Sequence, residues 1–312
     1  MDPVPISRRT VLAGLGALTV AGCAVRDARL TDVAVATGDE QGVYRRLGES
    51  LAGVWATDLG LHTRVVGSDG SVQNADLVGS GTTTVGFCAV DVAADALTDR
   101  SRPPLAALAR VHDDAIHVVV PAESPVHRLA DLRGRRVSLG APSSGVLVIA
   151  PRLLATVGLT ERDVEPVMLS LADSIAAVRR GEIDAFFWSG GVPTAGVEAL
   201  AAERPIRLID LTEEVLALRR AFDVYDATTV PARTYRLTDP VTTPSVRNVL
   251  LVAMALPRAT AQDLTRTLLE RRSTLAQADP AGRSIDPRTA IGSEPVPLHP
   301  GAAAAFRTLK GI

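Results

Sequence analysis

Aromatic residues are scarce in this 312-residue sequence and make up 3% of the chain. So few rings argue against stacking platforms for nucleic-acid bases and against large sugar sites. The formal net charge is −2 at pH 7, so the chain also lacks the basic excess that a nucleic-acid backbone attracts. Nucleic acid is therefore not expected as a partner.

Cysteine is almost absent, since only Cys23 and Cys88 occur. Cys88 lies in the apolar run VGFCAV, which predicts a buried small hydrophobic residue. No Cys or His cluster has the spacing of metal ligands. His112 and His117 are five residues apart, which does not place them on one helix face, and ordinary strand-edge histidines are the preferred interpretation. Neither a metal nor a cofactor is expected.

The motifs of common enzyme classes are missing too. The sequence has no G-x-S-x-G elbow, no P-loop, no H-E-x-x-H and no Cys/His pair. The turn GAPSSG resembles a nucleophile loop, but no histidine is placed by the sequence to serve it. We therefore expect a protein that is not an enzyme.

The N-terminus holds a short apolar run in place of a membrane span. Arg8-Arg9 precede VLAGLGALTVAG, which is about 12 residues long and suits a signal peptide. The run ends in small residues before Cys23, which resembles a bacterial lipobox. Residues 1–22 are thus predicted to be a twin-arginine signal peptide and Cys23 a lipidation site that anchors the chain outside the cytoplasmic membrane. The alternative is an uncleaved membrane helix with an incidental cysteine.

Strand and helix patterns alternate after this segment, and 46% of the residues are hydrophobic, enough for large cores. Such alternation predicts parallel sheets whose ligand sites lie at the carboxyl edge. In the first unit we expect strands at 33–37, 62–66 and 84–89 and helices at 43–59, 71–78 and 90–97. In the second we expect strands at 136–139, 165–169 and 185–188 and helices at 146–157 and 170–179.

The rest of the chain fits the same plan. We expect strands at 116–121, 206–211 and 248–255, helices at 213–222, 261–276 and 301–309, and a crossing back to the first unit at 225–230. The predicted fold is an α/β, periplasmic-binding-protein-like arrangement of two lobes joined by a hinge, with a ligand cleft between them. Lobe 1 is predicted to be discontinuous, at 30–120 and 231–312, and lobe 2 to span 121–230.

Several ordered motifs together resemble one known family. VAVATGDEQGVYRRLGESLA, GSDGSVQNADLVGSGTTTVGFCAVDVAADAL, SPVHRLADLRGRRVSLGAPSSG, IDAFFWSGGVPT and the closing PLHPGAAAAFRTLKG look like the TAXI solute-binding receptors of TRAP transporters. This resemblance implies a receptor that delivers a small carboxylate-type anion, such as glutamate, glutamine or a dicarboxylate, to a TRAP membrane permease. The open alternative is a ligand sensor that partners a membrane histidine kinase.

The positions that match the family's motifs are candidate ligand-binding residues. The turns that follow the predicted strands match the family's pattern at Thr37, Gly38, Tyr44, Gly70, Ser71, Asn74, Asp91, Ser143, Ser144, Gly145, Ser189, Gly190 and Pro193. One departure is Arg45-Arg46, which stand where the family has Tyr-Pro, and this departure leaves the ligand's identity open.

The same loops have a physical rationale without the family. Turns rich in Ser, Thr and Gly at helix N-termini present N–H groups and hydroxyls that hold an anion. Each position also has a plainer interpretation: Gly38, Gly70 and Gly190 serve tight turns, Tyr44 packs half-buried, and Asp91 caps a helix. The bare turn WSGGVPT is expected to let a ligand or the opposite lobe approach the backbone closely.

Overall fold

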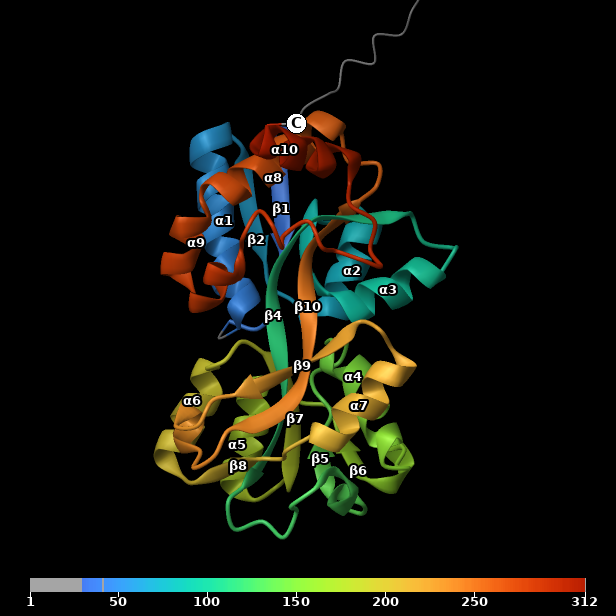
Figure 1. The fold of residues 1–312 in the computed structure, drawn as a ribbon, viewed down its shortest axis with the longest axis vertical. Helices are drawn as coiled ribbons and strands as arrows, with labels where there is room; N and C mark the ends of the chain where they lie inside the picture. The colour runs from blue at the N-terminus through green and yellow to red at the C-terminus, as the bar shows by residue number, and fades with distance from the viewer. Residues whose placement is uncertain (1–29, 41, 312) are drawn as a thin grey trace, which may run out of the picture.

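Two lobes stacked end to end make up the protein in this computed structural model (Figure 1), which describes residues 30–40 and 42–311. The predicted signal peptide and Cys23 lie outside the described residues, and both stay predictions. Among the residues described, no helix combines the length and the apolar character needed to cross a bilayer.

Lobe 1 carries the first three strands and the last helices of the chain. Its elements are β1 (Asp32–Ala36), α1 (Val43–Leu59), β2 (His62–Val66), α2 (Ser71–Gly79), β3 (Val85–Ala89), α3 (Val90–Thr98), α8 (Arg258–Glu270), α9 (Arg272–Ala278), the 3-10 helix η4 (Pro280–Ser284) and α10 (Pro300–Lys310).

Lobe 2 is made by the middle of the chain. Its elements are η1 (Leu129–Leu132), β5 (Arg136–Ser138), α4 (Val146–Thr156), η2 (Glu161–Asp163), β6 (Glu165–Val167), α5 (Leu171–Arg180), β7 (Ala185–Gly190), α6 (Ala195–Glu203), β8 (Ile206–Leu208), α7 (Thr212–Ala221), β9 (Tyr225–Val230) and η3 (Thr234–Arg236).

Two long antiparallel strands, β4 (Leu105–Pro121) and β10 (Val241–Ala253), pass through both lobes and join them into one sheet. The strand order is β2-β1-β3-β10-β4-β7-β5-β6, with β8 paired to β4 and β9 to β10. β1 is parallel to β2 and β3, and β5 is parallel to β6 and β7. The carboxyl ends of β1 and β3 therefore face those of β5 and β7 across the middle of the molecule.

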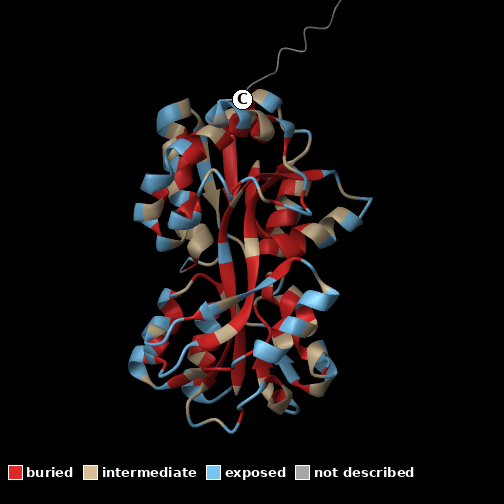
Figure 2. Cartoon of the chain, in the orientation of Figure 1, coloured by how far each residue is buried: buried red, intermediate tan, exposed pale blue. Residues whose placement is uncertain are grey.

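The helices form where periodicity and end signals agree. In α1 the buried Leu47, Leu51 and Trp55 recur at intervals of four, and Gly60 ends the helix in the left-handed conformation with φ 66°. In α5 the Ser170 hydroxyl accepts a hydrogen bond from the Asp173 backbone N–H and so caps the first turn. Figure 2 shows the result, with buried residues along the sheet and exposed residues on the outer helix faces.

The apolar core on one face of the sheet is continuous across the two lobes. It includes Cys88 and Val92 of lobe 1 together with Val146 and Ile149 of lobe 2. Burial of Cys88, with no exposed surface, confirms its prediction as a small core residue, and the same burial raises the pKa of its thiol. A core shared in this way holds the lobes against each other.

The predicted two-lobed α/β arrangement is the one observed, but several elements differ: α6 and the first halves of β4 and β10 were not predicted, and two predicted elements have another form. The crossing predicted at 225–230 is wrong, because β9 pairs along its length with Val241–Val246 of β10 inside lobe 2, and β10 itself makes the crossing. The helix predicted at 261–276 is two helices that break at Arg271. The predicted lobe borders at 120/121 and 230/231 stay predictions, because β4 and β10 belong to both lobes.

Candidate functional site

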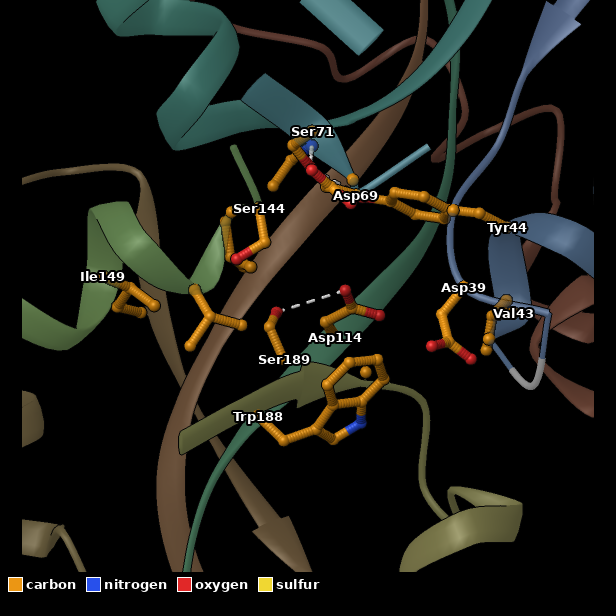
Figure 3. Close-up of a pocket in the computed structure, with 18 of the residues that line it drawn as sticks. Asp39, Val43, Tyr44, Asp69, Ser71, Asp114, Ser144, Ile149, Trp188 and Ser189 are labelled. Atoms are coloured by element: carbon orange, nitrogen blue, oxygen red, sulfur yellow. Dashed lines mark hydrogen bonds between the residues drawn. The ribbon is translucent and has the colours of Figure 1, made fainter. Parts of the chain in front are cut away.

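A pocket lies between the lobes, at the carboxyl ends of the parallel strands (Figure 3). Its atom-free space, including the open mouth, is about 630 Å³. Lobe 1 lines it with the turns after β1 and β2, the end of β3 and the starts of α1, α2 and α3, and lobe 2 with the start of α4 and the end of β7. The crossing strands contribute Asp114 of β4 and Val246 of β10.

Tyr44 and Ser71 form a fixed polar wall on the lobe 1 side. The Tyr44 hydroxyl donates to Asn248 Oδ1 and lies 3.2 Å from Ser71 Oγ, while the Tyr44 ring stacks on Phe87 with centroids 5.1 Å apart. Ser71 Oγ also accepts from the Ala89 N–H at 3.0 Å. Burial, followed by the negative charge of Asp114, raises the Tyr44 pKa well above its usual value, so this hydroxyl stays protonated.

Ser144 forms the facing wall at the start of α4. The turn before it depends on Gly140, with φ 94°, where a Cβ would lie 2.5 Å from Val146 Cβ and 2.8 Å from Ser144 Oγ. Ser144 is 7% exposed, and its Oγ has no hydrogen-bond partner among the described residues. A buried hydroxyl without a partner is costly, so Ser144 is available to a ligand.

Asp114 lies where β4 passes from one lobe to the other. Its Oδ2 accepts a hydrogen bond from Ser189 Oγ at 3.2 Å, the contact drawn in Figure 3. Trp188 lines the pocket beside them, and its Nε1 donates to Thr194 Oγ1 at 3.0 Å. That indole explains the bare turn, because a Cβ on Gly190 would lie 2.4 Å from Trp188 Nε1. A Cβ on Gly191 would lie 3.0 Å from Val43 of the opposite lobe.

Most of the predicted site residues come together at this pocket. Those that line it are Gly38, Tyr44, Gly70, Ser71, Asp91, Ser144, Gly145, Ser189 and Gly190. As ligand contacts these residues stay predictions.

The remaining predicted residues do not line the pocket. Thr37 is fully buried and donates to Val66 O, and Asn74 donates to the carbonyls of Thr37 and Phe87, so both brace the sheet edge. Ser143, with φ 62°, accepts a hydrogen bond at its carbonyl from the Gln73 N–H of lobe 1. Pro193 lies in a second groove between the lobes, which adjoins the pocket and shares Val43 and Asp114 with it.

Sequence reasoning missed Asp39, Asp69, Asp114 and Trp188, all of which line the pocket. Asp39 and Asp69 stand inside the turns TGDEQG and GSDGS, where the glycines drew attention away from the acids. Asp114 had a readable signal, a pair of acids between two apolar strand segments. Trp188 had another, as one of only two tryptophans and the residue directly before the small-residue turn.

Contacts across the boundary show that the lobes are closed over the pocket. The Gln73 N–H of α2 donates to the Ser143 carbonyl of lobe 2 at 3.1 Å. A Cβ on Gly70 would lie 3.4 Å from Ser144 Cα, and a Cβ on Gly145 would lie 3.3 Å from Ser71 Oγ. The N-terminal ends of α2 and α4 therefore touch each other beside the pocket.

A polar cluster next to the pocket also bridges the lobes. Arg152 of lobe 2 donates to Tyr225 at 2.8 Å and to Asp95 of lobe 1 at 2.6 Å, and Tyr225 donates to Asp91 Oδ2 at 2.7 Å. Burial is the main cause that raises the Asp91 pKa to about 6, against the opposing effects of Tyr225 and Arg152. Asp91 is thus held chiefly by protein groups.

The raised Asp91 pKa predicts an unusual dependence of stability on pH. A carboxyl whose pKa is higher in the folded than in the unfolded state penalises folding above pH 6, and the penalty disappears as the pH falls toward 4. The free energy of unfolding of the wild type, minus that of Asp91→Asn, is expected to rise by about 1–3 kcal/mol from pH 7.5 to 4.5. Urea unfolding of both proteins measures it, with Asp239→Asn, at an exposed position outside this cluster, as control. A constant or falling difference would contradict the prediction.

No group of three or more His, Cys, Asp or Glu side chains among the described residues has the arrangement of a metal site. His117 Nδ1 donates to the Ala115 carbonyl at 2.9 Å and its Nε2 lies 3.1 Å from Tyr235 Oη, and burial lowers its pKa to about 4. His112 instead packs edge-on against Tyr44 with ring centroids 5.7 Å apart. The two histidines therefore lie in separate environments.

Comparison with known proteins gives a family for the chain. A sequence model of the NMT1-like family matches residues 35–308. A protein of Escherichia coli (strain K12) named for the binding of aliphatic sulfonates is 32% identical over 90 residues. That alignment covers 27% of each chain, so this chain spans about a quarter of that relative's length.

Two solved structures share the two-lobed fold. The alkanesulfonate-binding protein SsuA from Xanthomonas axonopodis pv. citri, bound to MOPS, is 19% identical with a TM-score of 0.51 and covers 91% of this chain and 92% of its own. PhnD1 from Prochlorococcus marinus (MIT 9301), in complex with methylphosphonate, is 11% identical with a TM-score of 0.57 and covers 90% and 99%. The predicted fold class is confirmed by these structures. The relatives named for binding are not enzymes, as the sequence predicts for this chain.

The resemblance to TAXI receptors is wrong, since the matching family and the relatives lie elsewhere. The shared motifs are Gly- and Ser-rich turns at strand ends, and a cleft between two α/β lobes favours such turns whichever transporter it serves. Arg45-Arg46, in place of the TAXI Tyr-Pro, was the departure that pointed away. The expected partnership with a TRAP permease rested on this resemblance and is wrong as well. The relatives give no support to a histidine kinase as the partner.

Proposed function

The chain belongs to the NMT1-like family, and we propose that it is an extracytoplasmic solute-binding protein that delivers a small polar solute to the membrane permease of an ABC-type importer. The observation that carries the proposal is the pocket that both lobes line and close over. A solute held there contacts both lobes only in the closed form, so binding shifts the population toward closure. The relatives named for sulfonate binding support the same role.

Transport fits the site better than catalysis does. The pocket offers hydroxyls, carboxylates and an indole, but the described residues that line it include no His, Lys or Cys, and its Ser189 hydroxyl is paired only with the carboxylate of Asp114. A receptor must also release its cargo, and a hinge of two strands permits this by reopening. Export and lipidation through Cys23 would place the receptor beside its permease, and both are proposed from the sequence alone.

Removal of either pocket hydroxyl is expected to weaken binding. Ser144→Ala deletes an unpartnered hydroxyl, and Ser189→Ala deletes the donor to Asp114 Oδ2. Each loss should lower affinity about 5- to 15-fold, the usual effect of one hydrogen bond of 1–1.5 kcal/mol. The affinities are measured by calorimetry with any solute that raises the melting temperature.

The exposed Ser80→Ala, outside the pocket, is the matched control and should leave affinity unchanged. Unchanged affinity in both pocket variants would show that the solute binds elsewhere. Equal losses in all three variants would point to a general effect on the fold.

A further inference from the structure

We propose that the solute carries a protonated nitrogen that pairs with Asp114, and a hydrogen-bond acceptor at its other end that faces Ser144 and the N-termini of α2 and α4. This inference rests on the proposed function and names the class of solute. It differs from the small anion expected from the sequence and from the sulfonate in the names of the relatives.

The charge of the lining is the first argument. Four carboxylates line the pocket, those of Asp39, Asp69, Asp91 and Asp114, and the described residues that line it include no Lys, Arg or His. Arg152 and Tyr225 already hold Asp91 from outside the pocket. An anionic solute would gain no side-chain counter-charge here and would be repelled, whereas a cation is attracted.

Asp114 is the second argument, because it is buried and only half satisfied. It is 5% exposed, and Ser189 serves one of its oxygens. The other oxygen, Oδ1, lies 3.2 Å from His112 Nε2, but the two lack hydrogen-bond geometry and Oδ1 has no hydrogen-bond partner among the described residues. A buried carboxylate oxygen without a donor is costly, and an N–H group of a cation supplies both the donor and the charge.

The neighbours of Asp114 suit a cation in the same place. The Trp188 indole lies beside the carboxylate in Figure 3, with its N–H already donated to Thr194. An aromatic face next to a carboxylate attracts an ammonium group through its quadrupole. Ser189, which follows Trp188 on β7, fixes the orientation of the Asp114 carboxylate through its hydrogen bond.

The part of the lining formed by the starts of two helices has the reverse polarity. The pocket is lined there by Gly70 and Ser71 at the start of α2 and by Ser144, Gly145 and Val146 at the start of α4. Helix N-termini favour an acceptor or a negative atom, and the unpartnered Ser144 hydroxyl can donate to it. The two walls together select a solute that is positive at one end and accepts hydrogen bonds at the other.

Two sets of matched probes separate the amine from the hydrogen-bond acceptor. The protein is titrated with benzylamine, 4-(aminomethyl)benzoate and benzoate, with propylamine, β-alanine and propanoate, and with ethanesulfonate, and thermal shift and calorimetry are recorded. We expect the amine-bearing probes to bind, with the amine-plus-acceptor member of a set the tightest. Binding of benzoate, propanoate or ethanesulfonate alone would overturn the inference and leave the proposed function standing. No binding by any probe would count against both.

The Asp114→Asn variant tests the anchoring residue with the amine that binds best. The variant keeps the shape of the side chain and loses its charge, so affinity for the amine should fall about 30-fold or more. The member of the same probe set that lacks the amine should bind no worse. The matched control is the adjacent Asp113→Asn, whose exposed carboxylate pairs with Arg110 and does not line this pocket. An equal loss in both variants, or none in Asp114→Asn, would overturn the assignment.

Discussion

Valine in place of Gly145 is expected to lower the affinity for the solute by about 100-fold while leaving both lobes folded. A Cβ at this position would already lie 3.3 Å from Ser71 Oγ and 3.7 Å from Val92 Cγ2 of the opposite lobe, so the two further methyl groups of valine have no room when the lobes are closed. The backbone at Gly145, with φ −65°, accepts any residue, and the strain therefore falls on closure alone.

Small-angle scattering in the presence of solute should give a larger radius of gyration for the variant than for the wild type. Calorimetry should give the lower affinity. Gly145→Ala adds only the Cβ and should cost less than tenfold. The control is Gly53→Val on the exposed side of α1, where a Cβ meets nothing within 4 Å. Full affinity in Gly145→Val would show that the solute binds the open form equally well.

The largest loss of stability is expected from Trp55→Ala, about 3–5 kcal/mol in the free energy of unfolding. Trp55 has no exposed surface and packs among Leu47, Leu51 and Leu264 in the lobe 1 core. Its Nε1 also donates to the Leu264 carbonyl at 3.2 Å, and the variant would lose this additional hydrogen bond. Urea denaturation measures the loss.

Two further variants calibrate this loss, one a smaller change at Trp55 and the other a surface control in lobe 2. Trp55→Phe keeps most of the ring contacts and should cost about half as much. Leu216→Ala, at a side chain of α7 that is 55% exposed on the surface of lobe 2, should change stability by less than about 0.5 kcal/mol. A loss below 1.5 kcal/mol in Trp55→Ala would mean that the core around α1 collapses to fill the cavity.

Regular elements of the fold were predictable from hydrophobic periodicity. Helix α1 was predicted with its observed bounds, and α2, α3 and α5 to within a residue or two, because each carries one clear apolar face or cap. The first half of β4 was missed, since RVHDD interrupts its apolar pattern where the strand passes between the lobes. The crossing was placed at β9 for a related reason: β9 looks like a strand, but pairing partners are set by tertiary structure.

In the candidate site, too, local sequence patterns predicted some residues, and the others depend on tertiary structure. Gly70, Ser71, Ser144 and Gly145 were found because small residues after strands mark the carboxyl edge of a sheet. Asp114 was missed because it comes from the middle of a strand, and only the crossing of β4 brings it to that edge. The charge of the pocket depends on which acidic residues the fold brings together, and the sequence does not show this. The sequence therefore predicted an anionic ligand for a pocket that is lined by carboxylates.

The path of β10 sets the order in which the molecule can be completed during synthesis. β3 pairs with β10 along Val85–Ala89, yet the whole of lobe 2 is translated between them. At about 5–20 residues per second, the inner edge of β3 waits roughly ten to thirty seconds for its partner. Lobe 2 can therefore assemble first in the nascent chain, and the N-terminal strands remain the part that most needs protection from pairing with another chain until β10 arrives.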